Sequence, residues 1–483
     1  MPGPEFATLR DQVAALRAET ISATELLELT IARIDKFDDK VNAVVVRDFD
    51  RARAAAKRAD AALARGDRAP LLGVPVAVKE SFNVAGLPTT WGFPDAEGWQ
   101  PAEDAALVTR VKAAGGVVIG KTNVPRALHD WQSYNDIYGT TNNPWDLTRS
   151  PGGSSGGSSA ALAAGYVSLA LGSDIGGSLR VPAHFCGIFA HKPSRTLLPG
   201  RGNTPPRTPA LPAPSDLAVV GPMTRSAADL TLATLLLAGP DEVEAVAYKL
   251  ALAPPRSAEL ENFRVLVIDT HPLLPTSTVI RDGFDRIARG LEKAGATVAR
   301  SSALLPDLTL TANTYLTLLM SQFGADASVD THRALQVADI PPNADTPEAV
   351  IRRAFVASHG DWVRADRVRI DLADKWRRLF TEFDVVLCPI SPTPAFPHDH
   401  SDMDTRTIDI DGTTYPYNYH LVWASIATLI GLPATAAPIG RSPEGLPYGM
   451  QIIGPYLEDH TTLRFAELIE QEFGGFTPPP GFA

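Results

Sequence analysis

Hydrophobic and polar positions divide the chain into a helical beginning and a longer part in which strand-like and helix-like segments alternate. Residues 6–65 are rich in Ala, Leu, Arg and Glu at helical spacing, and Ser22 and Glu25 stand in the register of a capping box. Short β-branched runs then predict strands at 74–78, 117–119, 167–171, 265–268 and 385–387. Between them, the residue pattern predicts helices at 103–114, 226–238, 279–295 and 362–380.

This alternation predicts the fold class. When strands alternate with helices along a chain, the helices cover both faces of a sheet and bury its strands. We therefore expect an α/β fold, in which a single large domain has a central mixed β-sheet covered by helices on both faces. The sequence contains no internal repeat at a period of about 20–50 residues, which argues against a repeat architecture.

Composition narrows the function classes. The 483 residues include 44 Lys and Arg against 55 Asp and Glu, and the formal net charge of −11 argues against non-specific binding to nucleic acid or anionic lipid. Apolar residues make up 45% of the chain, which is typical of a globular protein. Two cysteines, Cys186 and Cys388, are too few for a disulfide framework or a Cys-rich zinc site. Without a signal peptide or a clean apolar stretch of ~18 residues, we expect a cytoplasmic protein.

Two proline-rich stretches, 199–214 and 389–404, predict irregular structure. Each is either a surface loop or the rim of a pocket, because long ordered loops in enzymes often carry specificity. The second stretch contains His398–His400, Asp402 and Asp404, which could in principle ligate a divalent ion. Because prolines flank them and they lack a helical register, we expect a polar loop and no metal site.

One motif in the sequence is misleading. Residues Gly115–Thr122 match the phosphate-binding pattern GxxxxGK[ST]. In a true P-loop the variable positions form a loop and the lysine opens a helix, whereas here they read Gly-Val-Val-Ile, which is a strand. Pro125 then disfavours an immediate helix. We therefore do not expect nucleotide binding at this segment.

The segment Gly152–Gly156 satisfies GxSxG, the nucleophile elbow of α/β-hydrolases, with Ser154 at its centre. An elbow needs a strand directly before it, and 142–149 is a poor strand candidate. Glycine-rich runs also match this pattern easily. The segment is thus either a flexible Gly/Ser turn or the position of a functional serine.

A second glycine-rich turn follows the predicted strand 167–171. Gly176 and Gly177 directly precede Ser178, and glycines tolerate the dihedrals that let backbone N–H groups converge on one point. Such convergence beside a serine is how an oxyanion hole is built next to a nucleophile. Asp174 and Arg180 flank the turn, and they either pair and hold it rigid or form a solvated surface pair.

Lys79 ends the apolar strand predicted at 74–78. Burying an ammonium group is expensive, so such a lysine either reaches solvent or is kept neutral as a base. Acting as a base at neutral pH requires its pKa to fall by roughly 3 units from ~10.4, a difference of about 4 kcal/mol. Burial at the end of an apolar strand shifts the pKa in that direction.

Taken together, these four segments resemble the amidase signature family of serine hydrolases. The central signature spans Pro151–Arg180, the resemblance extends over about 70–195, and it returns at Gly431–Ala434 and Gly445–Gly454. It implies that 1–65 is a helical N-terminal lead-in of the same domain and that 66–483 is the amidase signature domain. That domain divides into a core at 70–195, a variable substrate-side region at about 196–420 and a C-terminal return of sheet and helix at 421–475.

The resemblance also implies the roles of individual residues. It makes Ser178 the nucleophile, Ser154 a second serine that follows a cis peptide bond, and Lys79 the base, with the backbone N–H groups of an oxyanion hole supplied by Ile175, Gly176, Gly177 and Ser178. Supporting roles fall to Ser155, which should hydrogen-bond the lysine, and to Asp174 and Arg180. Substrate contacts are expected from the segment 128–132, namely from the carbonyl of Leu128 and from Asp130, Trp131 and Gln132. Trp131 is either an aromatic wall of the substrate channel or a core residue.

Near this chemistry the sequence departs little from the family pattern. Ser173 stands where Thr is commoner, and the segment 190–194 varies the family's Gly-x-Lys-Pro-Thr. Neither change removes a residue of the expected Ser-Ser-Lys triad. None of the ten histidines lies in a recognisable triad setting, and a lysine can replace histidine as the base only if its pKa falls toward the working pH.

The expected reaction is hydrolysis of an amide C–N bond through an acyl-enzyme on Ser178, with Ser154 relaying the proton between Ser178 and Lys79. It requires no metal and no cofactor. Among the family's substrates we favour small aryl amides, anilides or carbamate esters, with no nucleic-acid or membrane partner and with a homo-oligomer left open. The alternatives are the glutaminase subunit of a tRNA-dependent amidotransferase, a GxSxG esterase that uses Ser154, and a catalytically silent scaffold.

Overall fold

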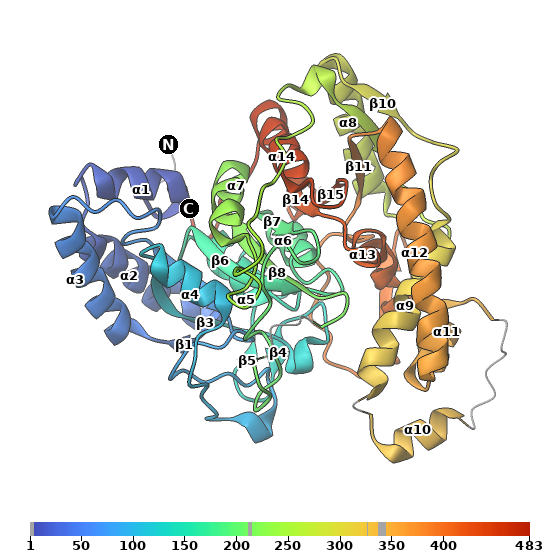
Figure 1. Cartoon of the computed structure of the whole chain (residues 1–483), viewed down its shortest axis with the longest axis horizontal. Coiled ribbons are helices and arrows are strands. Elements are labelled where there is room, and N and C mark those ends of the chain that lie inside the picture. Colours follow the sequence, from blue (N-terminus) through green and yellow to red (C-terminus); the bar gives the residue numbers. More distant parts are fainter. Residues whose placement is uncertain (1–3, 211–214, 326, 337–343) are drawn as a thin grey trace.

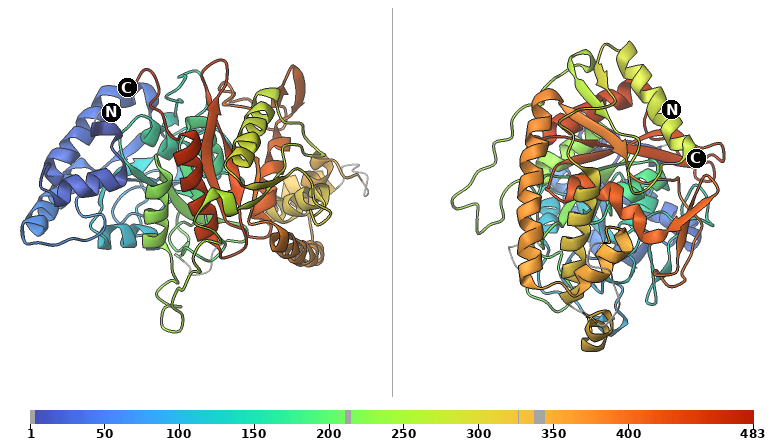
Figure 2. Two further views of the ribbon diagram at one scale, coloured as in Figure 1. Left: turned by 90° about the horizontal axis from the view of Figure 1, so that it is seen from above. Right: turned by 90° about the vertical axis from the view of Figure 1, so that its right-hand side faces the viewer.

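The computed structural model describes residues 4–210, 215–325, 327–336 and 344–483. The end of the first proline-rich stretch, 211–214, lies outside the described residues. Within the described part, eleven strands form one sheet with helices on both sides (Figures 1 and 2). In spatial order, they are β1 (Val44–Arg47), β3 (Val117–Thr122), β2 (Pro75–Lys79), β6 (Leu169–Asp174), β8 (Val219–Thr224), β7 (Phe189–Lys192), β14 (Ala434–Arg441), β15 (Pro447–Ile453), β11 (Val385–Pro389), β9 (Arg264–Val267) and β10 (Thr297–Ala299).

The sheet is mixed, as the sequence predicts. Strand β2 runs parallel to both β3 and β6, and β9 runs parallel to β10 and β11. The central strands β6, β8, β7, β14 and β15 pair antiparallel. Because β2 and β6 are parallel neighbours, their carboxyl ends meet at one edge of the sheet. Lys79 and Asp174, the last residues of these two strands, therefore lie at the same edge.

The predicted strands and helices are confirmed, with boundaries that differ by a few residues. The largest change for a strand is at β6, which begins two residues after 167 and runs on to Asp174. The four predicted helices correspond to α4 (Ala106–Ala113), α7 (Ala227–Leu237), α8 (Thr278–Lys293) and α12 (His359–Glu382). The remaining helices of the outer layers are α5 (Gly156–Ala163), α6 (Arg180–Cys186) and α14 (Asp459–Phe473).

The N-terminal segment contains helices α1 (Leu9–Arg17), α2 (Ala23–Val41) and α3 (Phe49–Ala64). The capping box predicted at Ser22 and Glu25 is present at the start of α2. The interpretation of this segment as purely helical is incomplete, because β1 lies between α2 and α3 and pairs antiparallel with β3. The strand consists of three β-branched residues, Val44-Val-Val, and the arginine that follows. A run this short is hard to recognise in the sequence between two strong helical patterns.

A group of helices stands beyond one end of the sheet, at the right of Figure 1. It comprises α9 (Leu308–Ala325), α10 (Val329–Gln336), α11 (Pro347–Phe355) and part of α12, and α13 (Leu421–Thr428) packs beside α9. Buried residues Leu316, Leu319, Val350, Ala354 and Leu372 join α9, α11 and α12 into a core of their own. None of the described helices is long and apolar enough to span a membrane.

Candidate active site

Lys79 is fully buried at the end of β2, and its Nζ is bound by two hydroxyl groups. It donates to Ser154 Oγ at 2.7 Å and to Ser173 Oγ at 2.9 Å. Burial lowers the pKa of this lysine to about 7, while the negative charge of Asp174 acts in the opposite direction. A substantial fraction of the side chain is therefore a neutral amine near pH 7, and a neutral amine can accept a proton.

Ser154 lies in a glycine-rich loop. This loop packs closely against the backbone of another segment, and the close packing brings Ser154 to Lys79. The Gly153–Ser154 peptide bond is cis, as the resemblance implies. A side chain at position 153 would meet the carbonyl oxygen of Asp130 at 2.3 Å, so only glycine fits there. The next residue, Ser155, donates its backbone N–H to the carbonyl of Ser178 at 3.2 Å. This hydrogen bond joins the Ser154 loop to the Ser178 turn.

The role expected for Ser155 is not what the structure gives. Its hydroxyl lies 3.3 Å from both the backbone carbonyl and the backbone nitrogen of Ser173, and in the described residues it makes no hydrogen bond to Lys79. The second hydroxyl on the lysine is that of Ser173. Ser155 is therefore hydrogen-bonded to the backbone of Ser173 near the end of β6, and the Ser173 hydroxyl is hydrogen-bonded to Lys79. In the sequence, Ser173 attracts notice only as a departure from threonine, and a hydroxyl beside the strand end is the signal that could have found it.

The turn that carries Ser178 is held by a buried ion pair. The Asp174 carboxylate accepts two hydrogen bonds from the Arg180 guanidinium, at 2.9 and 3.0 Å, and three from the backbone N–H groups of Gly177, Leu179 and Arg180, at 2.9, 3.1 and 3.4 Å. Burial alone would raise the pKa of Asp174, but Arg180 and these hydrogen bonds lower it to about 2. The interpretation that Asp174 and Arg180 pair is confirmed, and the surface-pair alternative is wrong, because both side chains are buried.

Three of the four N–H groups expected in the oxyanion hole are open. In the described part of the chain, the backbone N–H groups of Ile175, Gly176 and Ser178 have no hydrogen-bond acceptor. The N–H of Gly177 differs, because it donates to Asp174. Gly177 instead supplies the positive φ of 96° that lets the turn close. Its expected place among the oxyanion donors is therefore corrected.

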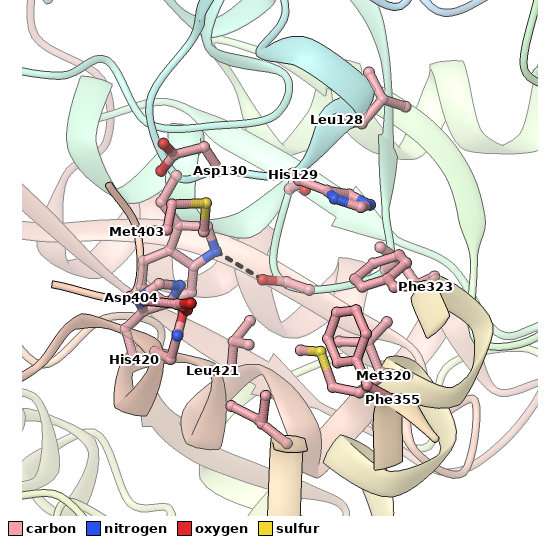
Figure 3. Close-up of a pocket in the computed structure, with 17 residues that line it drawn as sticks. Leu128, His129, Asp130, Met320, Phe323, Phe355, Met403, Asp404, His420 and Leu421 are labelled. Carbon is pink, nitrogen blue, oxygen red and sulfur yellow. Dashed lines mark hydrogen bonds between the residues drawn. The ribbon is translucent and has the colours of Figure 1, made fainter. Parts of the chain in front are cut away.

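Ser178 lines a cavity of about 210 Å³. Figure 3 shows the residues that surround this cavity. The hydrocarbon side of its wall comes from helices α9, α11 and α13, and the Phe323, Met320 and Phe355 side chains lie together in Figure 3. The polar side chains Asp130, Asp404 and His420 lie on another side of the same space. Burial lowers the pKa of His420 to about 3, so this imidazole is neutral at physiological pH. Among the described residues, no lysine or arginine lines the cavity.

The segment expected to bind substrate lies at this cavity, with one exception. Leu128, Asp130 and Trp131 line it, but Gln132 does not. The Gln132 amide instead binds the backbone of Asp399 twice, at 2.7 and 2.9 Å. The carboxylate of Asp130 is likewise taken by the protein, because it pairs with Arg406 and accepts the hydroxyl of Tyr417 at 2.7 Å.

The sequence leaves open whether Trp131 is a wall residue or a core residue, and the structure places it in both positions. Its side chain is 3% exposed and belongs to the hydrophobic core, and it also lines the cavity. The indole Nε1 donates to the carbonyl oxygen of Gly176 at 2.8 Å, and the ring stacks obliquely against His420 with 3.7 Å between centroids. One tryptophan thus touches the cavity, the core and the turn that precedes Ser178.

Comparison with known proteins places this geometry in a family. A model of the amidase family matches residues 25–463. The chain belongs to the amidase family. Among curated relatives, the A subunit of glutamyl-tRNA(Gln) amidotransferase from Anaeromyxobacter sp. (strain K) is 34% identical over 98% of this chain and 97% of its own. The protein of the same name from Geobacillus kaustophilus is 31% identical over 94% of this chain and 95% of its own.

Solved structures share the fold over nearly the whole length. A chain from the vestigial protein complex that reveals the evolutionary origins of an s-triazine catabolic enzyme superposes with a TM-score of 0.80 at 29% identity, covering 96% of this chain and 98% of that chain. A bacterial aryl acylamidase of the amidase signature family gives the same TM-score at 23% identity, with 97% and 96% coverage. At that identity the second likeness concerns the fold alone.

Several residues around the cavity of this amidase are not found from the sequence. Leu319 and Phe323 line it at one-turn spacing on α9, and Phe355 lines it from α11. The i, i+4 spacing is present in the sequence, but it is shared by every buried helix and so does not single out a cavity wall. The end of the second proline-rich stretch is a pocket rim, because Met403 and Asp404 line the cavity.

Proposed function

We propose that this member of the amidase family hydrolyses amide C–N bonds through a covalent acyl-enzyme on Ser178, with Ser154 and Lys79 as the proton relay. The observation that carries the proposal is the buried amine of Lys79, which has a pKa of about 7 and lies 2.7 Å from Ser154 Oγ. A lysine with an ordinary pKa would be fully charged at neutral pH and would have no lone pair to accept a proton. Ser178 supplies a hydroxyl at the cavity, where a substrate carbonyl can reach it.

In the first step, Ser178 Oγ attacks the carbonyl carbon of the amide. Its proton passes to Ser154 Oγ as the proton of Ser154 passes to the neutral Lys79 amine. The C–N bond then breaks, and the departing nitrogen takes a proton back along the same relay. This leaves an ester on Ser178 and releases the amine. Water then attacks that ester by the same proton transfers, and it releases the carboxylic acid and restores the Ser178 hydroxyl.

The negative charge that develops on the carbonyl oxygen needs donors that are fixed in advance. The open N–H groups of Ile175, Gly176 and Ser178 are suited to this role, since the protein leaves them without acceptors in its described part. The buried Asp174–Arg180 pair keeps the turn from relaxing when the charge appears. Removing one donor from such a site typically costs a factor of roughly 10²–10³ in kcat.

The cavity supports a neutral substrate that carries an apolar or aryl group, as in an anilide, a small aryl amide or an aryl carbamate. An apolar cavity of roughly 150 Å³ can hold a benzene molecule, and this one measures about 210 Å³. Phe323, Met320 and Phe355 offer hydrocarbon and ring surface on one side. The neutral imidazole of His420 offers a polar contact on the other.

A second candidate is the glutaminase half-reaction of an amidotransferase, and the 34% identity to a glutamyl-tRNA(Gln) amidotransferase chain favours it. Glutamine brings an α-carboxylate, which proteins usually bind with arginine or lysine. No such cation lines the cavity in the described residues, so we rank the neutral amide first. If this second function is correct, a partner chain should co-purify and glutamine should be the preferred substrate.

The test is a substrate panel assayed on the purified chain, containing acetanilide, benzamide, a phenyl carbamate and glutamine. We expect turnover of the aryl substrates and a fall of roughly 10⁴-fold or more in Ser178→Ala, with an unchanged unfolding midpoint. A fluorophosphonate probe followed by peptide mapping should place the label on Ser178. A label on Ser154 would support the GxSxG esterase instead, and an unlabelled protein would support a silent scaffold. Substantial activity in Ser178→Ala would refute the assignment of the nucleophile.

A further inference from the structure

Two aromatic side chains, Tyr315 and Trp131, donate hydrogen bonds to the turn that precedes Ser178. The hydroxyl of Tyr315 donates to the carbonyl oxygen of Ile175 at 2.8 Å. The indole of Trp131 donates to the next carbonyl oxygen, that of Gly176, also at 2.8 Å. Two successive peptide groups of the turn are thus each fixed by one side chain from a distant part of the chain.

Fixing a carbonyl fixes the N–H group on the other side of the same peptide bond. The peptide unit is planar, and in the trans form its C=O and N–H point in opposite directions. Because Trp131 binds the Gly176 carbonyl, the Gly177 N–H is aimed the other way, where it meets Asp174. Because Tyr315 binds the Ile175 carbonyl, the Gly176 N–H is aimed away from Tyr315. That N–H is one of the three that have no acceptor in the described residues.

Tyr315 does not itself belong to the cavity wall. Its side chain is fully buried, and it is absent from the residues that line the space in front of Ser178. Burial raises the pKa of its hydroxyl far above the ordinary value, so the group stays protonated and can donate a hydrogen bond at neutral pH. An effect of Tyr315 on catalysis therefore has to act through the turn and not through contact with substrate.

One face of α9 contacts both the turn before Ser178 and the cavity. Leu319 follows Tyr315 by one helical turn, Phe323 follows Leu319 by another, and both line the cavity. Tyr315 therefore connects the helix that forms the apolar wall to the peptide that presents the Gly176 N–H. A shift of α9 would move the wall and the donor together.

We propose that Tyr315 is a positioning residue, which aims the Gly176 N–H at the oxygen that becomes negatively charged during amide hydrolysis. The inference rests on the proposed function, and it adds a residue from the helical region to the machinery of the glycine-rich turn. It predicts that loss of the tyrosine hydroxyl weakens stabilisation of the transition state while binding of the neutral substrate stays the same.

The first experiment compares Tyr315→Phe with Tyr456→Phe in steady-state kinetics on an anilide. Tyr456 is a matched control, because its hydroxyl also donates to a backbone carbonyl, that of Arg195 at 3.0 Å, on an exposed part of the molecule. For Tyr315→Phe we expect kcat to fall about tenfold, KM to stay within about twofold, and the pH midpoint of kcat to stay at that of the wild type. Tyr456→Phe should match the wild type in all three quantities. A rise in KM with unchanged kcat, or no change, would overturn the inference.

Two further measurements separate this inference from a structural effect and from the proposed function. Leu319→Ala removes cavity surface on the same helix face, so it should raise KM more than it lowers kcat, and equal patterns in both variants would mean that Tyr315 merely supports the wall. The rate of fluorophosphonate labelling needs no amide substrate, and it should fall severalfold in Tyr315→Phe because the phosphoryl oxygen uses the same donors. A wild type that neither hydrolyses amides nor is labelled overturns the proposed function. A labelled wild type whose rate is unchanged in Tyr315→Phe overturns this inference alone.

Discussion

The two sides of the cavity differ in how they are built. On one side, Lys79, Ser154 and Ser178 come from strand ends and glycine-rich loops at one edge of the sheet, and hydrogen bonds and a buried ion pair fix the turns that carry them. On the other side, α9, α11 and the segment from Met403 to Leu421 form a wall of mostly apolar side chains. Under the proposed function, the first side performs the chemistry and the second decides which amide fits. The proposal therefore assigns reaction class and substrate class to separate parts of the chain, and each can be tested alone.

The largest effect should come from the sheet side, when the amine is removed. Lys79→Met keeps the length and apolar body of the side chain, so the buried site should remain filled while activity falls by roughly 10³–10⁴-fold. In the wild type, kcat should rise with pH around a midpoint near 7, because only the neutral amine accepts a proton and burial lowers the pKa of Lys79 to about 7. A pH–rate profile on an anilide checks this. A midpoint above 9 would mean that the lysine is charged and plays another part.

The sequence predicts this side well because its signals are local. Gly176, Gly177 and Ser178 are adjacent, Asp174 and Arg180 bracket them, and a lysine that ends an apolar strand is unusual in itself. Parallel pairing of β2 with β6 then brings the separate motifs to one edge. Two details could not be read, namely that Ser173 rather than Ser155 binds the lysine and that Asp174 takes the Gly177 N–H. Both depend on side-chain directions at a strand end and not on residue type.

The apolar wall of the cavity could not be predicted from the sequence, because its residues meet only through tertiary packing. Phe323 and Phe355 are ordinary apolar positions of two helices, and nothing in either helix marks the face that borders a cavity. Asp130 and Gln132 look like polar substrate contacts in the sequence, but Arg406 and Asp399 bind them from a segment some 270 residues away. The strand β1 is missed for a related reason, since a four-residue run between two strong helices gains its stability from pairing with β3.

The next largest effect should be a loss of stability when the ion pair between Asp130 and Arg406 is broken. Asp130 and Arg406 are both about 2% exposed at their side chains and form an ion pair behind the cavity rim. Arg406→Gln leaves the Asp130 carboxylate buried without its cation, which typically costs about 3–5 kcal/mol in the free energy of unfolding. Urea denaturation should register this loss. The double variant Asp130→Asn with Arg406→Gln should recover part of it, and an additive result would show that the two side chains do not act as a pair.

A smaller and more selective effect is expected from the wall itself. Phe323→Ala removes a ring from the cavity, and we expect KM for an anilide to rise about tenfold, close to the lower end of the ~1.5–3 kcal/mol of burying such a side chain. The pH midpoint of kcat should not move, because Lys79 lies on the other side. Ile370→Ala is the matched control, since it shortens an apolar side chain that is 64% exposed on α12. An equal rise in KM for acetamide, which has no ring, would contradict the assignment of an aryl-binding wall.

The smallest effect we predict concerns Ser173, the one residue of the sheet side that the sequence does not assign. Its hydroxyl lies 2.9 Å from Lys79 Nζ, next to the hydrogen bond to Ser154. Ser173→Ala should lower kcat on an anilide about fivefold, because one hydrogen bond contributes roughly 0.5–1.5 kcal/mol. Ser173→Thr keeps the hydroxyl and should stay within about twofold of the wild type. If both variants lose activity equally, activity depends on the packing around the end of the strand and not on the Ser173 hydroxyl. The hydrogen bond from Lys79 to Ser154 would then be sufficient to position the lysine.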